Sequence, residues 1–275
     1  MKKITFLFVS ILIALTINFS SATAQDIQPS GETIGQDKDG NAVYQINSNG
    51  IKIGYKLIGS GKPLVMIVGL ANTMDRWPKE VIDTLSKKYQ LIILDNRGMG
   101  YTTANDLTFT YKLFADDVIG LLDSLKVEKT HVLGFSMGST ITQELLLDYP
   151  QRFDKAIIYA TSTGGSNVAA TLKGKAPSGE SSVNPTILRQ IEATTHWKTP
   201  LDKLPAIENQ VMFIVGTSDT VVGVESSKTL ASAVPGAWLV QFKSGSHGFM
   251  SETPAEFAKI VLDFLEINET VGVKQ

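Results

Sequence analysis

The hydrophobic residues of this chain form short runs that alternate with segments of helical spacing. Runs of five or six mostly apolar residues, bounded by Gly, Asp or Asn, are typical of strands buried on both faces of a sheet. They cover residues 64–68, 90–94, 130–135, 155–160 and 211–215, with a further strand at 237–242. The segments between and after them place apolar residues near helical spacing. These segments predict helices over residues 77–88, 111–125, 137–148, 224–234 and 252–266.

A predicted hairpin precedes this alternation. Residues 43–46 and 51–57 flank the turn-forming segment Asn47-Ser48-Asn49-Gly50, which favours an antiparallel pair. Residues 25–41 are polar with scattered Gly and Asp, so we expect a solvated lead-in. Strands that alternate with helices are typical of a parallel sheet covered on both faces. The sequence therefore predicts one α/β domain over residues 42–275, with a mostly parallel central sheet of about eight strands.

The periodicity fails in one interval, between Thr161 and about Glu208. Glycine and proline interrupt this interval repeatedly, and only residues 186–197 keep a helical pattern. We expect an insertion at about residues 164–208 that stands outside the alternating strands and helices.

The amino-terminal segment has the pattern of a secretory signal peptide. It starts with Met1-Lys2-Lys3, continues with an apolar stretch of about 14 residues, and closes with Ala22-Thr23-Ala24. The alternative is an uncleaved membrane tether, but the apolar stretch is shorter than the roughly 20 residues of a spanning helix. We therefore expect residues 1–24 to direct export to the periplasm or the extracellular space. After cleavage, no stable membrane attachment is expected.

Composition narrows the function classes. The chain has 275 residues, 43% of them hydrophobic and 19% charged, with a net charge of −2 and no cysteine. A core of this size needs no disulfides, and the absence of a basic stripe argues against nucleic acid as a partner. The segment Gly59-Ser60-Gly61-Lys62-Pro63 lacks the spacing of a phosphate-binding loop. We expect no metal, nucleotide or flavin cofactor, and the oligomeric state stays open.

The chemistry is indicated by the sequence Gly134-Phe135-Ser136-Met137-Gly138, which follows a predicted strand and precedes a predicted helix. In this G-x-S-x-G context the serine lies at the apex of a sharp turn, and its glycines allow neighbouring backbone to approach closely. The turn exposes the hydroxyl and points the amide groups of the next helix at it. The motif therefore predicts Ser136 as a nucleophile.

A serine nucleophile needs a base and an acid, and two later segments supply them. Asp219 follows the strand at 211–215, and His247 follows the strand at 237–242 within a Gly-Ser loop. Both lie at the carboxyl ends of predicted strands, where open α/β sheets bind ligands. The alternative for Asp219 is a helix N-cap. Of the other two histidines, His131 falls inside a strand as a core residue, and His196 lies in the insertion.

On these motifs the chain resembles the α/β-hydrolase superfamily, over nearly its whole length after the leader. Asp95-Asn96-Arg97-Gly98-Met99-Gly100 is similar to the family's D-x-R-G-x-G turn, and Val68-Gly69-Leu70 stands where many members have His-Gly. The resemblance implies that the insertion is a short cap over the active site and that the Leu70 and Met137 amides form an oxyanion hole. Val68 replaces the usual histidine. The family's other position for the acid, after the strand at 155–160, has no carboxylate, which favours Asp219.

These features predict an exported serine hydrolase that cleaves a small or medium carboxylic ester or lactone through an acyl-enzyme. Ser136, His247 and Asp219 would be the nucleophile, base and acid. Phe135, Trp197, Val221 and Phe249 are candidates for binding a small ester-like substrate. Peptidases, carbon–carbon bond hydrolases and perhydrolases of the superfamily use much the same constellation. A ligand-binding or receptor-like protein on a hydrolase scaffold is the alternative from another class.

Overall fold

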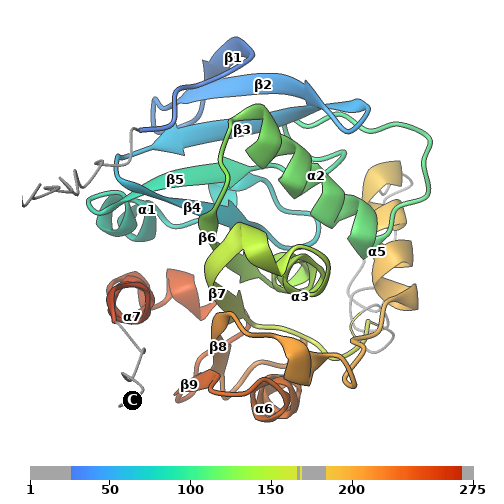
Figure 1. The fold of residues 1–275 in the computed structure, drawn as a ribbon, viewed down its shortest axis with the longest axis vertical. Coiled ribbons are helices and arrows are strands. Elements are labelled where there is room, and N and C mark those ends of the chain that lie inside the picture. Colours follow the sequence, from blue (N-terminus) through green and yellow to red (C-terminus); the bar gives the residue numbers. More distant parts are fainter. Residues whose placement is uncertain (1–25, 166–167, 169–183, 268–275) are drawn as a thin grey trace, which may run out of the picture.

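The computed structural model describes residues 26–165, 168 and 184–267. The expected signal peptide, residues 1–24, lies outside the described residues, as does most of the first half of the insertion. Nine strands form one open sheet in the order β1-β2-β3-β5-β4-β6-β7-β8-β9 (Figure 1). The strands are β1 (Glu32–Gln36), β2 (Ala42–Ser48), β3 (Ile51–Ile58), β4 (Lys62–Ile67), β5 (Tyr89–Leu94), β6 (Thr130–Phe135), β7 (Phe153–Tyr159), β8 (Gln210–Gly216) and β9 (Trp238–Phe242).

The sheet has an antiparallel edge and a parallel body. The strands from β5 through β4, β6, β7 and β8 to β9 all pair in parallel. The predicted hairpin is present as β2 and β3, and β3 pairs antiparallel with β5. The predicted mostly parallel sheet is therefore confirmed. Because parallel strands end at one edge of the sheet, the segments after β4, β6, β8 and β9 meet there.

Helices cover both faces of the sheet, as expected. On one face, α1 (Lys79–Leu85) and α7 (Pro254–Glu266) contact each other, and on the other α2 (Tyr111–Ser124) packs against α3 (Met137–Asp148). The helix α6 (Val224–Ala233) contacts β8 and β9, and α5 (Pro185–His196) is a helix of the insertion. Short 3₁₀ turns are η1 (Met74–Arg76), η2 (Pro150–Arg152), η3 (Leu204–Ala206) and η4 (Phe249–Ser251).

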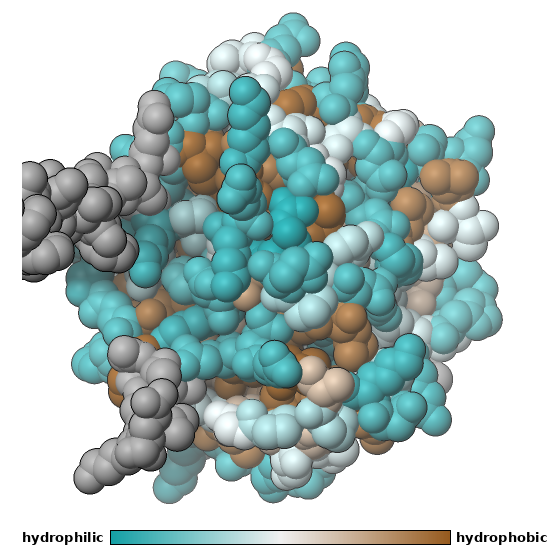
Figure 2. All heavy atoms as spheres, in the orientation of Figure 1, coloured by the Kyte–Doolittle hydropathy of each residue, from teal (hydrophilic) through white to brown (hydrophobic). Residues whose placement is uncertain are grey.

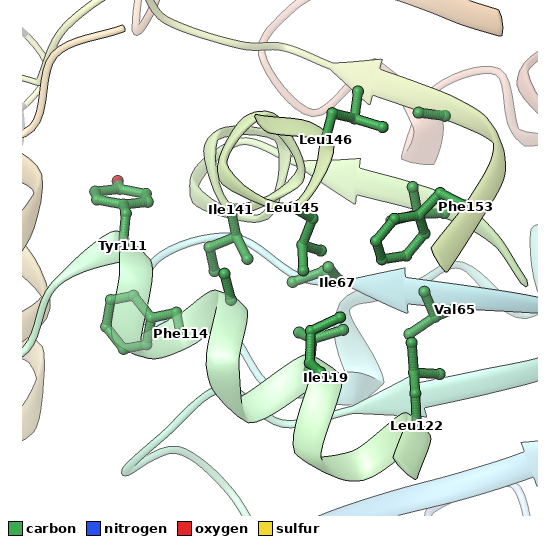
Figure 3. Close-up of a cluster of buried hydrophobic side chains, with 14 of the residues drawn as sticks. Val65, Ile67, Tyr111, Phe114, Ile119, Leu122, Ile141, Leu145, Leu146 and Phe153 are labelled. Atoms are coloured by element: carbon green, nitrogen blue, oxygen red, sulfur yellow. The ribbon is translucent and has the colours of Figure 1, made fainter. Parts of the chain in front are cut away.

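The core between α2, α3 and the sheet holds the strands in place (Figure 3). Val65 and Ile67 of β4 are fully buried, and Leu122 of α2 and Leu145 of α3 share their cluster. Burying one such side chain contributes about 1.5–3 kcal/mol. The outer surface is different: Figure 2 shows hydrophilic side chains over most of the face in view, with smaller hydrophobic patches between them. No helix in the described ranges is apolar over a length that would cross a membrane.

The ninth strand is the main difference from the sequence prediction. The segment 25–41, expected to be a solvated lead-in, contains β1, which pairs antiparallel with β2. Four of the five β1 residues are exposed, so the strand has no apolar pattern by which to recognise it. Its place is fixed by pairing and by a buried ion pair of 2.6 Å between Asp37, just after β1, and Lys56 of β3. The segment therefore belongs to the domain.

The loop after β5 is braced by a buried ion pair. Arg97 donates from Nε to Asp117 Oδ2 at 2.8 Å and from Nη2 to Asp117 Oδ1 at 2.5 Å. A third bond, from Nη1 to Asn105 Oδ1, measures 2.8 Å. The two charged side chains are 0% and 5% exposed. This D-x-R-G-x-G segment is therefore a structural brace that ties the loop to α2.

Arg97→Met is expected to lower the free energy of unfolding by about 3–5 kcal/mol, because it leaves the Asp117 carboxylate buried without its cation. Urea unfolding followed by circular dichroism measures this change. Lys79→Met is the control, since Lys79 pairs with Asp83 on the surface and such pairs contribute about 0–1 kcal/mol. Unfolding curves of Arg97→Met and wild type that coincide would contradict the assignment.

Candidate active site

Ser136 occupies a strained turn between β6 and α3. Its backbone has φ 54° and ψ −117°, a conformation that costs a non-glycine residue about 1–3 kcal/mol. The flanking glycines are required by close contacts: a methyl group at Gly134 would lie 2.3 Å from the Gly138 carbonyl oxygen, and one at Gly138 would lie 2.2 Å from that of Ile67. The Ser136 amide donates to the Tyr159 carbonyl oxygen at 2.9 Å, which fixes the turn against β7.

The structure brings the three predicted catalytic side chains together. His247 Nε2 lies 2.9 Å from Ser136 Oγ, and His247 Nδ1 lies 2.8 Å from Asp219 Oδ2. The three residues are far apart in sequence, but each follows the carboxyl end of a parallel strand, β6, β8 or β9. An alcohol, an imidazole and a carboxylate in series can transfer the hydroxyl proton to the ring while the acid holds its tautomer.

Asp219 is held ionised inside the protein. Its side chain is fully buried, and Oδ1 accepts hydrogen bonds from the Val221 and Val222 amides at 2.9 and 3.0 Å. Burial raises the pKa of Asp219. The hydrogen bond and charge of His247, together with these two amides, have a larger opposite effect, so the pKa lies below its ordinary value. The alternative of a helix N-cap is wrong, because the N-cap of α6 is Gly223, and Asp219 Oδ1 binds the amides of the turn that precedes this helix.

Tyr159 fixes the loop that carries His247. Its hydroxyl donates to the His247 carbonyl oxygen at 3.0 Å. The Phe135 ring contacts both the Tyr159 ring and the His247 ring, with centroid distances of 4.9 and 5.2 Å. His247 is therefore held through its backbone carbonyl group as well as through the hydrogen bond between its ring and Asp219.

The two predicted oxyanion donors lie beside Ser136. Met137 is the first residue of α3, so its amide has no acceptor within the helix. Leu70 follows Gly69, where a methyl group would lie 3.1 Å from Ser136 Cβ. In the part of the chain that the structure describes, the Leu70 amide donates no hydrogen bond. Both residues line the same cavity as Ser136 and His247.

Side-chain amides hold the loop in which Val68 replaces the family's usual histidine. Asn96 Nδ2 donates to the Val68 carbonyl oxygen at 2.9 Å, and Asn72 Nδ2 donates to that of Leu70 at 2.8 Å. Gln190 of α5, which belongs to the insertion, accepts a hydrogen bond of 2.9 Å from the Ala71 amide through Oε1. Gln190 is fully buried. The backbone of this loop is therefore fixed without the histidine.

A cavity of about 210 Å³ opens at Ser136. Phe135, Trp197 and Val221 line it, as the sequence suggested. Phe249 is different: it is 1% exposed and packs on Phe242, Tyr159 and Phe257 in the core, so it is not among the described lining residues. The lining also includes residues that sequence patterns did not single out, among them Tyr111, Thr140 and Thr194, because nothing local marks them.

The remaining histidines lie away from this cavity. His131 is buried in β6 against the Tyr89 ring, and burial lowers its pKa to about 4. Its Nδ1 has no hydrogen-bond partner within the described residues. His196 is exposed on α5 and pairs with Glu192 at 2.7 Å. Neither contacts Ser136. Over the described ranges, no cluster of three or more His, Asp or Glu side chains is arranged to hold a metal ion.

Comparison with known proteins agrees with this fold. The family model for the alpha/beta hydrolase fold matches residues 62–173. An alpha/beta hydrolase fold protein from Chitinophaga pinensis superposes with a TM-score of 0.74 at 24% identity, covering 82% of this chain and 98% of that one. The matched family segment runs from β4 to beyond β7 and includes the turn at Ser136.

The chain is also similar in sequence to curated proteins. It is 35% identical over 119 residues to a Synechocystis sp. protein provisionally named a non-heme chloroperoxidase, covering 43% of each chain. A 2-hydroxymuconate semialdehyde hydrolase from Pseudomonas sp. strain CF600 is 24% identical over 262 residues, covering 80% of this chain and 93% of that protein. The chain spans about two fifths of the length of the first curated relatives it matches. Together with the strand order and the turn at Ser136, the family match shows that the chain has the alpha/beta hydrolase fold.

Proposed function

We propose that this protein is a serine hydrolase that cleaves a small or medium carboxylic ester or lactone through an acyl-enzyme intermediate. The observation that carries the proposal is the hydrogen-bonded series Ser136, His247 and Asp219 at the cavity. A serine at a strained strand-to-helix turn, paired with a histidine that a buried carboxylate orients, is the arrangement that acyl transfer requires.

The reaction would proceed in two halves. Ser136 Oγ attacks the carbonyl carbon while His247 Nε2 takes its proton, and the carbonyl electrons move to oxygen. His247 then gives the proton to the departing alkoxide as the bond to the leaving group breaks. Water attacks the acyl-enzyme with the same histidine as base, which releases the acid and restores Ser136. Asp219 stabilises the imidazolium that forms in each half.

The developing oxyanion would be bound by the amides of Leu70 and Met137. Their positions beside Ser136 and their free N–H groups support this role. The loss of one such donor raises a barrier by about 2.7–4 kcal/mol in well-studied hydrolases. The start of α3 adds its positive helix end at the same place.

The size of the cavity favours small substrates. About 210 Å³ is below the roughly 300–1,000 Å³ of common ligand pockets. The lining combines apolar surfaces, such as Phe135 and Trp197, with a few hydroxyl groups. This suits a short acyl chain or a small ring. Hydrolases among the relatives support hydrolysis as the reaction class.

Two measurements test the proposal together. A fluorophosphonate probe is expected to label the purified protein once per chain, with peptide mapping that places the label on Ser136. A panel of p-nitrophenyl esters of increasing acyl length, lactones and aminoacyl amides is expected to show highest kcat/KM for short esters or lactones. Ligand binding without labelling would favour the receptor-like alternative. Preference for amides, or rates that depend on hydrogen peroxide, would favour a peptidase or a perhydrolase.

Export remains part of the proposal. The pattern of residues 1–24 supports a cleaved signal peptide, which would place the enzyme in the periplasm or outside the cell. A small molecule, and neither nucleic acid nor a membrane, is the proposed partner.

A further inference from the structure

Arg76 is a charged residue that lines the cavity, and the proposed mechanism gives it no role. It belongs to η1, directly after the proposed oxyanion loop, and lines the cavity with Ser136 and His247. The described lining residues include no Asp or Glu, and Arg76 is the permanent cation among them. Arg76 is partly exposed, so its charge reaches both the cavity and the surrounding water.

The surrounding contacts fix the guanidinium next to the catalytic histidine. Nη1 donates to Ser251 Oγ at 2.9 Å. Nη2 lies 2.6 Å from the place where a methyl group at Gly248 would be, so the guanidinium rests against the residue after His247. The guanidinium carbon lies 5.8 Å from the centroid of the Phe135 ring. The charge is thus held between the residue before Ser136 and the residue after His247.

This charge has no acidic partner among the described residues. The adjacent Asp75 pairs with Lys56 at 3.2 Å, and no carboxylate lies within 4.0 Å of the Arg76 guanidinium in the described ranges. Arg97 provides the contrast, since its donors are used by Asp117, Asn105 and a backbone carbonyl. A guanidinium has five N–H donors, and the hydrogen bond to Ser251 uses one of them. The remaining donors are available to a ligand.

We propose that Arg76 binds a carboxylate on the substrate, and that the natural substrates are esters or lactones whose leaving group carries this acid. The assignment to the leaving group follows from position, because His247 protonates the departing oxygen and Arg76 lies on the Gly248 side of that histidine. Arginine pairs with carboxylates in bidentate geometry, and such charge-assisted bonds are among the strongest polar contacts. This inference rests on the proposed serine hydrolase activity and names its substrate class.

The test compares 4-acetoxybenzoate with its methyl ester, which have the same acetyl group and differ in one charge. For the wild type, kcat/KM is expected to favour the anionic ester. Arg76→Met is expected to reduce the ratio of the two kcat/KM values at least tenfold, mainly through KM of the anionic ester, and Arg76→Lys to retain part of it. Lys79→Met removes a nearby surface charge and is expected to leave the ratio unchanged. An unchanged ratio in Arg76→Met would overturn the proposal.

A binding measurement separates this inference from the hydrolase proposal. With Ser136→Ala as background, calorimetry measures the dissociation constant of 4-acetoxybenzoate without turnover. Adding Arg76→Met is expected to weaken this binding at least tenfold, and equal dissociation constants would refute the role of Arg76 even if no ester is hydrolysed. Turnover of the neutral methyl ester by the wild type reports on the hydrolase proposal alone.

Discussion

Ser136→Ala is expected to lower kcat for p-nitrophenyl acetate by about 10⁴- to 10⁶-fold, with the fold intact. The expected loss is large because the members of such a series act as a unit, and removal of the nucleophile leaves only binding and oxyanion stabilisation. The fold should survive because the backbone bonds of Ser136 do not involve its hydroxyl: the amide donates to Tyr159, and the carbonyl oxygen accepts from Ser139. Alanine bears the same backbone strain as serine.

Steady-state kinetics and thermal unfolding of the same preparation check this prediction. Ser139→Ala is a suitable control, because Ser139 is a buried serine in the next turn that donates to the Ser136 carbonyl oxygen and does not contact His247. Its kcat should change far less than that of Ser136→Ala. If Ser136→Ala keeps a rate near that of the wild type, another group is the nucleophile.

Asp219→Asn is expected to lower kcat by about 10⁴-fold. The carboxylate accepts the Nδ1 proton of His247 at 2.8 Å, which leaves Nε2 free to accept the proton of Ser136. An asparagine would present an amide N–H to Nδ1, favour the opposite tautomer, and remove the charge that stabilises the imidazolium. The Val221 and Val222 amides would still have an acceptor, so the turn should hold.

The pH dependence sharpens this second prediction. Because the pKa of Asp219 lies below its ordinary value, its carboxylate stays ionised as pH falls through the usual range of aspartic acids. Its contribution to stability is present above that range and is lost only when pH falls through the lowered pKa. Protonation of Asp219 should therefore not limit wild-type activity in mild acid. Asp263→Asn changes an exposed carboxylate on α7 and should leave kcat and its pH dependence unchanged. A loss of kcat in this variant as large as that in Asp219→Asn would contradict the role of Asp219.

Local patterns were sufficient to predict the parallel body of the sheet and the three residues of the hydrogen-bonded series. The buried strands are apolar on both faces, and Ser136, Asp219 and His247 each follow such a strand. The strand order then brings these three residues together, whereas the sequence alone shows only their order along the chain. The predicted strand at 211–215 and helix at 186–197 correspond to β8 and α5 within one or two residues.

What sequence patterns missed depends on long-range contacts. The strand β1 carries no apolar alternation and exists because its backbone pairs with β2. Phe249 follows His247 closely, which suggested a cavity residue, but the turn η4 directs it into the aromatic core beside Phe257. No motif in the sequence contains Arg76. Its place in the cavity follows from the fold of the loop after β4.

The hydrogen bond between Gln190 and Ala71 ties α5 to the loop after β4. Both segments line the cavity, α5 through Thr194 and the loop through Leu70. If α5 swung outward, the Ala71 amide would lose its acceptor at 2.9 Å, and the net loss of such a hydrogen bond costs about 0.5–1.5 kcal/mol. The same displacement would separate the Thr194 and Tyr111 hydroxyl groups, now 3.1 Å apart. We therefore expect the substrate to enter the cavity while α5 stays in place. A solvent or mutation that breaks the contacts of α5 should lower kcat under conditions in which the rest of the protein is still folded.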